Sequence, residues 1–325
     1  MHMFTQYPEV HRADFGAAYS RMGRLRWTPL VALALSAAKG RRAAREWDNC
    51  GAVRRWLRGH RGGGGVGNNW AGAHGGALSF SQYGQDVVVL SLVHALAASE
   101  PEVERVYLDV AANEARLGSN TYLLDKCFKW RGVCVEPNVA YHKGIRDSRS
   151  CNLVDTCVSD SPRTVEFENA FFLGHIVDGA AVERKRRRRR LDTTTLRCVT
   201  IGGILALGRL SRVTYLSLDV EGHELPALRG IDWNATLVDA LTLENAAEEH
   251  YAFLDAVGLA PFLCLGIDTL FVRRPLLPAA DAWHTANRAR LEPLCAVRDT
   301  ARCFAGDERN FDCSVRTGFW NAWQR

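Results

Sequence analysis

The most regular feature of the chain is a series of short apolar runs that each end in polar residues. The run Val213–Asp219 contains β-branched and large side chains and leads into Asp219-Val-Glu221-Gly-His223-Glu224. Such a run predicts a strand buried on both faces of a parallel sheet. The polar residues then follow the carboxyl end of the strand, where open α/β sheets bind ligands. Because buried charges without partners are costly, we expect these side chains to face a cleft.

Strand-like and helix-like segments alternate from residue 78 to residue 275, which predicts a mainly parallel sheet. The last two strands, Pro261–Leu265 and Thr269–Arg273, are joined by a short turn and should form an antiparallel hairpin. We therefore predict an α/β fold with a Rossmann-like, mostly parallel seven-stranded sheet, flanked by helices and closed by this C-terminal hairpin. The other predicted strands are Val106–Val110, Gly132–Glu136, Asn152–Val158, Thr164–Phe167, Val213–Asp219 and Leu237–Glu244. The predicted helices are Gln82–Ala98, Ser119–Lys129, Val139–Arg146, Ile201–Leu210, Glu224–Leu228 and Ala246–Val257.

Composition divides the 325 residues into three parts. Residues 1–77 contain an Arg-rich segment and the glycine-rich linker Gly59–Gly76, which cannot offset its ordering entropy by burial. Residues 78–275 form the predicted folded domain, and residues 276–325 a C-terminal extension. A content of 47% hydrophobic and 24% charged residues suits one sizeable globular domain with appendages.

The net charge of +5 is unevenly distributed, and much of it comes from the run Arg184–Arg190 and the first sixty residues. A nucleic-acid-binding protein should spread its basic residues over a folded face, and no aromatic residues interleave with these arginines. No nucleic-acid partner is therefore expected. We interpret residues 184–190 as a solvated basic loop, because like charges repel. A nuclear localisation signal and a patch that steers an anionic substrate are the alternatives.

The N-terminal segment has the layout of a signal peptide. Arginines precede the apolar stretch Trp27–Ala38, and further basic residues follow it. The stretch is shorter than the ~20 apolar residues of a membrane span, and an amphipathic helix or an organelle transit peptide is the alternative. The sequence slightly favours the ER, the Golgi or secretion, with a membrane tether through the N-terminus, over an organelle or the cytoplasm. The sequon Asn234-Ala-Thr236 would be usable in a secretory lumen, although sequons also occur by chance.

The ten cysteines do not by themselves settle the compartment, because they show neither a C-x-x-C pair nor zinc-site spacing. Cys134 and Cys264 lie in apolar runs, and we interpret them as buried core thiols. Cys295, Cys303 and Cys313 lie in the polar C-terminal region and are better candidates for disulfides.

Four stretches, taken together and in order, resemble the FkbM-type methyltransferase family. They are Ser81–Asp86, Leu108–Asn113 with Ser119–Tyr122, Trp130–Asn138, and Leu216–Glu224. Each is weak alone, but the ordered set is specific, and the resemblance extends over about Leu78–Arg273. It implies a class I methyltransferase fold and transfer of a methyl group from S-adenosylmethionine. The implied acceptor is a hydroxyl of a sugar, a glycan or a small metabolite.

The resemblance also implies where the cofactor lies. Glu136, at the end of the second strand, is placed to accept both ribose hydroxyls. The N–H groups at the start of the helix after the first strand suit a carboxylate, and Asp155 or Ser159 would reach the adenine edge. The implied cofactor-binding residues are Asp109, Ala111, Asn113, Ser119, Asn120, Thr121, Glu136, Asp155 and Ser159.

One departure from the family pattern affects the first turn, which is normally D-x-G-A-N-x-G. Here Ala111 and Ala115 replace both glycines. Alanine at a position with positive φ costs on the order of 1 kcal/mol. Either the turn takes a path that still admits the cofactor, or binding is weakened. An impaired methyltransferase fold that serves as an interaction module in the secretory pathway is therefore the alternative function.

The polar cluster after Leu218 suggests a catalytic base. Methyl transfer requires an aligned acceptor oxygen that loses its proton. His223 is the candidate base, because the pKa of a free imidazole lies near neutrality, and Asp219 and Glu221 are the other candidate catalytic residues. The alternative is that His223, Glu221 and Glu224 cap the following helix.

A metal site is the second interpretation of the same sheet edge. Asp219, Glu244 and Asn245 would offer oxygen ligands to Mg²⁺ from neighbouring strand ends, and the ion would lower the pKa of the acceptor hydroxyl. The alternative is that Glu244 and Asn245 bind backbone. A weaker hypothesis takes Asp219-Val-Glu221 as the metal motif of a glycosyltransferase.

Overall fold

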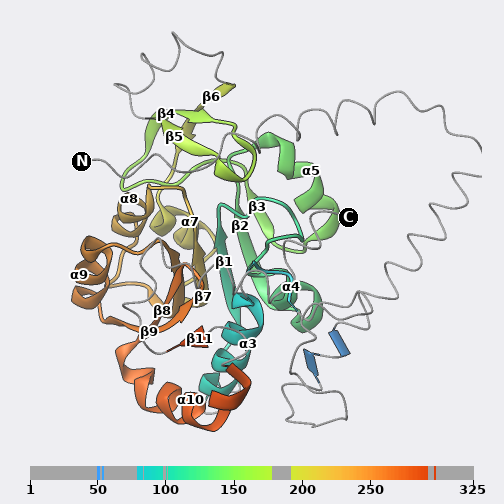
Figure 1. The fold of residues 1–325 in the computed structure, drawn as a ribbon. Helices are drawn as coiled ribbons and strands as arrows, with labels where there is room; N and C mark the ends of the chain where they lie inside the picture. The colour runs from blue at the N-terminus through green and yellow to red at the C-terminus, as the bar shows by residue number, and fades with distance from the viewer. Residues whose placement is uncertain are drawn as a thin grey trace, which may run out of the picture. The chain divides into compact units, whose positions relative to one another are not determined.

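In a computed structural model of the chain, the structure describes residues 50–51, 53–54, 79–82, 84–97, 100, 102–177, 192–291 and 296–297 (Figure 1). These all belong to one compact unit, Asn49–Arg325. The predictions for the signal-like stretch, the glycine-rich linker, the basic loop and Cys295, Cys303 and Cys313 lie outside the described residues. Within the described part, no helix has the length and apolar composition to cross a membrane.

The central sheet confirms the predicted α/β fold. Its eight strands have the order β11-β9-β10-β8-β7-β1-β2-β3. β3, β2, β1, β7 and β8 pair in parallel, and β10 pairs antiparallel with both β8 and β9. Seven of the eight predicted strands form this sheet, and the two-residue β11 adds an eighth strand at the β9 edge. The strands are β1 (Val106–Val110), β2 (Arg131–Val135), β3 (Asn152–Val154), β7 (Arg212–Leu218), β8 (Leu237–Glu244), β9 (Leu259–Leu265), β10 (Asp268–Arg273) and β11 (Ala296–Val297).

Helices cover both faces of this sheet, and alternation along each strand divides the core between them. On β1, Tyr107 belongs to the cluster that contains side chains of α3, α4 and α10, whereas Leu108 and Val110 belong to the cluster with α7, α8 and α9. Both clusters are fully apolar and buried, which fixes the register of the strands. The helices are α3 (Gln85–Leu96), α4 (Tyr122–Phe128), α5 (Val139–Ser148), α7 (Ile201–Leu207), α8 (Glu224–Arg229), α9 (Glu248–Ala256) and α10 (Leu277–Leu291).

A second, three-stranded antiparallel sheet lies between β3 and α7 in the chain and has the order β5-β4-β6. It consists of β4 (Arg163–Glu168), β5 (His175–Val177) and β6 (Thr193–Cys198). The predicted strand at residues 164–167 therefore exists as β4, but outside the main sheet. The strand predicted at residues 152–158 already ends at Val154, since the chain then turns toward the small sheet. β5 and β6 were not predicted.

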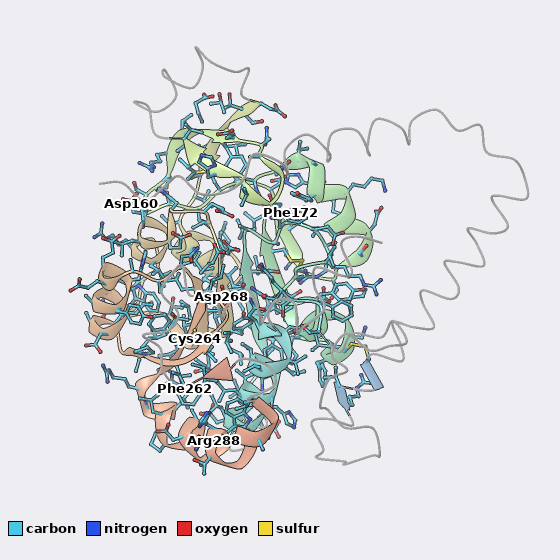
Figure 2. All side chains as sticks on the ribbon, in the orientation of Figure 1. Asp160, Phe172, Phe262, Cys264, Asp268 and Arg288 are labelled. Atoms are coloured by element: carbon cyan, nitrogen blue, oxygen red, sulfur yellow. A yellow bond between two sulfur atoms is a disulfide. The ribbon has the colours of Figure 1, made fainter. Side chains whose placement is uncertain are left out.

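The predicted C-terminal extension begins with α10, which packs on α3. Trp283 Nε1 donates a hydrogen bond to Ser91 Oγ (3.1 Å). The ring of Phe262 on β9 lies 6.4 Å from that of Trp283, centroid to centroid, and Figure 2 shows Phe262 beside α10. Residues 277–291 thus complete the apolar core on this side of the sheet.

The interpretation of Cys134 and Cys264 as free thiols was wrong. Both side chains are buried, as expected, but both are disulfide-bonded. Burial does not distinguish a thiol from a disulfide, and the partner of Cys134 comes from the loop before β3. All seven cysteines in the described part of the chain form disulfides, three of which are Cys50–Cys127, Cys134–Cys151 and Cys157–Cys198.

Candidate active site

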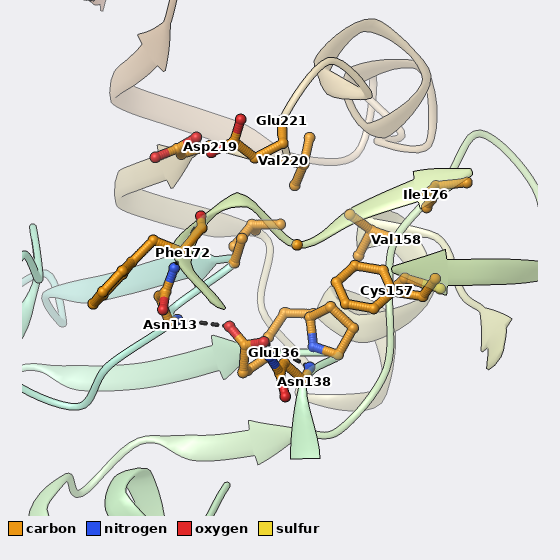
Figure 3. Close-up of a pocket in the computed structure, with 16 residues that line it drawn as sticks. Asn113, Glu136, Asn138, Cys157, Val158, Phe172, Ile176, Asp219, Val220 and Glu221 are labelled. Carbon is orange, nitrogen blue, oxygen red and sulfur yellow. Dashed lines mark hydrogen bonds between the residues drawn. The ribbon is translucent and has the colours of Figure 1, made fainter. Parts of the chain in front are cut away.

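A pocket opens at the carboxyl ends of β1, β2 and β7, against the small sheet (Figure 3). Its empty space, part of which is open to solvent, measures about 560 Å³. The strand ends contribute polar residues, among them Asn113, Glu136 and Asp219. Most of the remaining lining is apolar and comes from Pro137, Cys157, Val158, Phe167, Phe172 and Ile176, which we call the apolar wall. The apolar wall suits an apolar ring, and the polar strand ends suit hydrogen-bond donors.

Glu136 follows β2 and is held rigidly in this pocket, with only 3% of its surface exposed. Its Oε2 accepts a hydrogen bond from the Asn113 N–H (2.6 Å), and its Oε1 accepts one from the Asn138 N–H (2.7 Å). Burial raises the pKa of Glu136 to about 7 despite these two bonds. Each carboxylate oxygen retains a lone pair that can accept a further hydrogen bond from a hydroxyl.

The first turn takes the conformation that glycine would adopt. Ala111 has φ 62° and Asn113 has φ 54°, both in the left-handed region, and both residues line the pocket. Ala115 does not have a positive φ, and its methyl group is 3% exposed within the core. The two alanines therefore differ in consequence, because only the alanine at position 111 strains the backbone.

This difference gives two opposite expectations for glycine substitutions. We expect Ala111→Gly to raise the free energy of unfolding by about 1 kcal/mol, because it removes the left-handed strain. We expect Ala115→Gly to lower the free energy of unfolding by about 1–2 kcal/mol, because it removes a buried methyl group and increases the conformational entropy of the unfolded chain. Urea unfolding of both variants measures the two effects. A destabilised Ala111→Gly variant would contradict the strain at this turn.

Three acceptor oxygens at the strand ends have no hydrogen-bond partner in the described part of the chain. They are Asn113 Oδ1, Asn120 Oδ1 and Asp219 Oδ1, and all three are buried. The amide nitrogen of Asn113 donates to the Phe172 carbonyl (3.3 Å), and that of Asn120 donates to Ser217 Oγ (3.0 Å). Because unpaired buried acceptors are costly, the oxygens of Asn113 and Asp219, which line the pocket, are suited to the donor groups of a bound ligand. Asn120, although predicted to bind the cofactor, does not line the pocket.

Three other predicted cofactor residues belong to a buried network instead of the pocket lining. Thr121 Oγ1 donates to Asp109 Oδ2 (2.5 Å), and the buried Arg149 lies 3.6 Å from that same oxygen. Arg149 Nη1 also donates to Ser119 Oγ (3.1 Å). The physical reason is strand alternation, since Asp109 shares the face of β1 with Tyr107 whereas Val110 faces the pocket. The side chains of these three residues thus stabilise the fold around Arg149.

The residues predicted to reach adenine also lie elsewhere. Asp155 is exposed and forms an ion pair with Arg146 (3.4 Å). Ser159 is fully buried, and its Oγ lies 3.1 Å from His223 Nε2. Neither residue lines the pocket. Cys157 and Val158 occupy this stretch of the lining instead, together with the small sheet.

His223 does not line the pocket either. Its Nε2 lies 3.1 Å from Ser159 Oγ and 3.4 Å from Arg163 Nη2, so the ring contacts the segment that leads into the small sheet. The residue stands at the N-cap of α8, but its side chain makes no capping hydrogen bond. The structure thus supports neither of the two roles considered for His223 from the sequence.

The acidic residues that follow β7 and β8 converge. Asp219, Glu221 and Glu244 offer carboxylate oxygens that all lie within 4.8 Å of one another. Burial and the neighbouring charges of Asp219 and Glu224 raise the pKa of Glu221 to about 8. Glu244 hydrogen-bonds to Asp219, and burial next to this second carboxylate raises the pKa of Glu244 strongly. We call Asp219, Glu221 and Glu244 the acidic triad.

The residues beside the acidic triad have structural roles. Asn245 is exposed, and its backbone N–H donates to the Ile267 carbonyl (3.1 Å). Glu224 Oε1 accepts from the backbone N–H groups of Val220 (3.2 Å) and Gly222 (3.0 Å) and so fixes the loop that carries Glu221. Of the predicted metal ligands, Asp219 and Glu244 therefore meet, and Glu221 takes the place expected for Asn245.

Backbone strain is concentrated at the same edge of the sheet. Six non-glycine residues in the described part have positive φ, and four of them follow the carboxyl ends of β1, β7 and β8. These four are Ala111, Asn113, Glu221 and Asn245. Strain of this kind persists where the surrounding structure holds it and often accompanies a functional site.

The buried carboxyls predict how stability depends on pH. Burial raises the pKa of Glu136 and of Asp268 to about 7, and that of Glu221 to about 8. The folded state therefore holds more protons than the unfolded state between about pH 5 and pH 8, and stability falls as pH rises through this window. The slope is about 1.4 kcal/mol per pH unit for each excess proton. Urea unfolding at pH 6 and pH 8 measures it.

The matched control for this pH dependence is Asp268→Asn. Asp268 is buried and accepts a hydrogen bond from Gln85 Nε2 (2.9 Å), which an asparagine carbonyl can still accept. The variant should show a shallower loss of stability between pH 6 and pH 8. A wild-type protein whose stability is constant or increases over this range would contradict the assignment of raised pKa values.

Some residues of the pocket could not be foreseen from the sequence. Phe167, Phe172 and Ile176 come from the small sheet and its connecting segment, which resembled no functional motif. The run Phe171–Leu173 is apolar within a polar stretch, and this was the only local signal.

Comparison with known proteins agrees with this geometry. No curated protein matches the chain. Residues 109–256 match the family model described as the methyltransferase FkbM domain. The matched range contains the end of β1 and all of β2, β7 and β8, and the carboxyl ends of β2, β7 and β8 carry Glu136 and the acidic triad. Residues 109–256 are therefore similar to the methyltransferase domain of the FkbM family.

Proposed function

We propose that this protein is an S-adenosylmethionine-dependent O-methyltransferase that acts on a hydroxyl of a sugar, glycan or small metabolite. The single observation that carries the proposal is the pocket itself. Glu136 lies on one side of it and the acidic residues Asp219 and Glu221 on the other (Figure 3). Glu136 suits the cofactor at one end of the pocket, and the carboxylates of Asp219 and Glu221 suit a hydroxyl acceptor at the other end.

The residues present fit S-adenosylmethionine in three respects. The carboxylate of Glu136 can accept the ribose hydroxyls, as acidic residues do at this position of Rossmann-like sheets. The apolar wall with Phe167, Val158 and Ile176 suits the adenine ring. The unpartnered oxygen of Asn113 suits the ammonium group of the methionine moiety. Bound there, the cofactor supplies an electrophilic methyl group.

The acidic triad would activate the acceptor. Glu221 lines the pocket, and its pKa of about 8 makes it a competent base near neutral pH. In the direct form of the mechanism, the Glu221 carboxylate accepts the proton of the acceptor hydroxyl, and Asp219 and Glu244 share a proton beside it. His223 is not assigned a role in this step, because its ring contacts Ser159 outside the pocket.

A divalent cation is a further element of the proposal. The carboxylate oxygens of the acidic triad lie close enough together to hold one ion, and hard cations prefer such oxygens. Mg²⁺ would lower the pKa of the acceptor hydroxyl when bound there. Cation binding should also displace protons from Glu221 and Glu244, so that added Mg²⁺ raises the melting temperature more at pH 8 than at pH 6.

The test of the proposed function is a transfer assay with methyl-labelled S-adenosylmethionine and a panel of free sugars, glycans and small hydroxylated metabolites, with and without Mg²⁺. We expect label in at least one hydroxyl acceptor and none in the protein alone. The impaired-fold alternative predicts that no acceptor is labelled. Label on an amine or a thiol acceptor, with none on hydroxyls, would retain the methyltransferase and contradict the acceptor class.

A further inference from the structure

The disulfides place folding of this chain in an oxidising compartment. All seven cysteines in the described part are disulfide-bonded, and the bridges join residues 77, 17 and 41 positions apart. One of these bridges includes a residue of the pocket lining. The bridge Cys157–Cys198 joins the segment after β3 to the last residue of β6, and Cys157 lines the pocket. Disulfides of this number persist in secretory and extracellular environments, where thiols are not kept reduced.

The sequon Asn234-Ala-Thr236 lies in an exposed turn between α8 and β8. The carboxylate of Asp232 accepts hydrogen bonds from the backbone N–H groups of Asn234 (3.1 Å) and Ala235 (3.3 Å). These bonds hold the backbone of the turn, while Asn234 and Ala235 are both exposed to solvent. The Asn234 amide is therefore in position to carry a large polar group without displacing any packed side chain.

The turn lies at the opposite end of the sheet from the pocket. It precedes Leu237, the first residue of β8, whereas the acidic triad includes Glu244, the last residue of that strand. A strand of this length separates the two ends by about 23 Å at ~3.3 Å per residue. A glycan on Asn234 would thus leave the cofactor and acceptor sites accessible.

We propose that Asn234 is an N-glycosylation site and that the mature protein carries an oligosaccharide there. The donor is an oligosaccharide linked to a lipid through a pyrophosphate. The Asn234 amide nitrogen forms a bond to C1 of the first sugar and loses one proton to solvent, and the bond between C1 and the pyrophosphate oxygen breaks. The lipid pyrophosphate leaves with the bonding electron pair, so no oxidation or reduction occurs.

The structure also sets the order of events. Thr236, the residue whose hydroxyl completes the sequon, is only 6% exposed in the folded protein. The transferase must therefore act before β8 enters the sheet. The folded, disulfide-bonded protein should be a poor substrate, although its Asn234 side chain is exposed.

The test uses the full chain expressed in a eukaryotic secretory system, with a second sample that carries a cleavable secretion signal before Met1. Digestion with a glycoamidase, which hydrolyses the amide bond between the glycan and asparagine, should increase the gel mobility of the wild-type chain and convert Asn234 to aspartate in its tryptic peptide. Asn234→Gln and Thr236→Ala should abolish the shift. The matched control Thr236→Ser keeps the hydroxyl and should retain it.

Each other outcome overturns the proposal. If the chain enters the lumen and forms its disulfides but Asn234 is unmodified, Asn234 is not a glycosylation site. If the chain from both samples has reduced thiols, the argument that it folds in an oxidising compartment fails. A shift that persists in Asn234→Gln assigns the glycan to another residue. None of these outcomes bears on the methyl-transfer assay, so the two proposals fail independently.

Discussion

Replacing Glu136 with glutamine is expected to weaken S-adenosylmethionine binding on the order of 100-fold. Two ribose hydroxyls that donate to a buried carboxylate contribute about 1.5 kcal/mol or more each, and a neutral amide cannot replace both bonds. The amide NH₂ would also face one of the two backbone N–H groups that Glu136 now accepts from, those of Asn113 and Asn138. Isothermal titration calorimetry at pH 8 measures the change in Kd.

The affinity of the wild-type protein should also depend on pH. Because the pKa of Glu136 is raised to about 7, its carboxylate is lost as pH falls below that value, and binding should weaken between pH 8 and pH 6. Glu136→Gln should show a smaller pH dependence than the wild type. Asp155→Asn is the matched control, because Asp155 is an exposed acid outside the pocket and should change neither affinity nor its pH dependence. Equal affinities of wild type and Glu136→Gln would refute the ribose contact.

Neutralising the acidic triad is expected to reduce turnover by about 10²–10⁴-fold, the usual contribution of a positioned base. Glu221→Gln removes the proposed base. Asp219→Asn removes the carboxylate that shares a proton with Glu244. Cofactor affinity should change much less in Glu221→Gln, because Glu136 and the apolar wall are unaltered. Initial rates with the best acceptor from the transfer assay, at saturating cofactor, measure the loss.

The control for the triad separates catalysis from folding. His223→Asn removes the ring that contacts Ser159 but leaves every residue of the pocket lining in place. We expect it to retain most of the activity at pH 8, whereas Glu221→Gln does not. If His223→Asn lost activity as strongly as Glu221→Gln while melting at the wild-type temperature, the base would be His223 and the present assignment would be wrong.

The α/β class could be predicted because the alternation of strands and helices follows from local sequence pattern. The apolar run before Asp219 and the glutamate after the second strand both mark strand ends, and parallel strands must bring those ends to one edge. The β9–β10 hairpin follows from two strand-like runs on either side of a tight turn. β5 and β6 were not predicted, because they are short and pair only with β4. Their stability therefore depends on contacts with another strand, outside their own sequence.

The candidate site was predicted in part for the same reason. Glu136 and Asp219 were found because a residue directly after a buried strand projects into the crevice. Asp109 and His223 were misplaced because the sequence does not show that Arg149 and Ser159 lie within reach of their side chains. From one sequence, the ends of helices and strands can be predicted better than the partners of buried polar groups, because tertiary packing sets those partners.

The central claim is that the pocket between Glu136 and the acidic triad binds S-adenosylmethionine, and calorimetric titration of the full chain tests it most directly. We expect one site per chain with a micromolar Kd for S-adenosylmethionine, and measurable binding of its demethylated product. Absence of any heat with both compounds at pH 8, from protein that unfolds cooperatively in urea, would contradict the account.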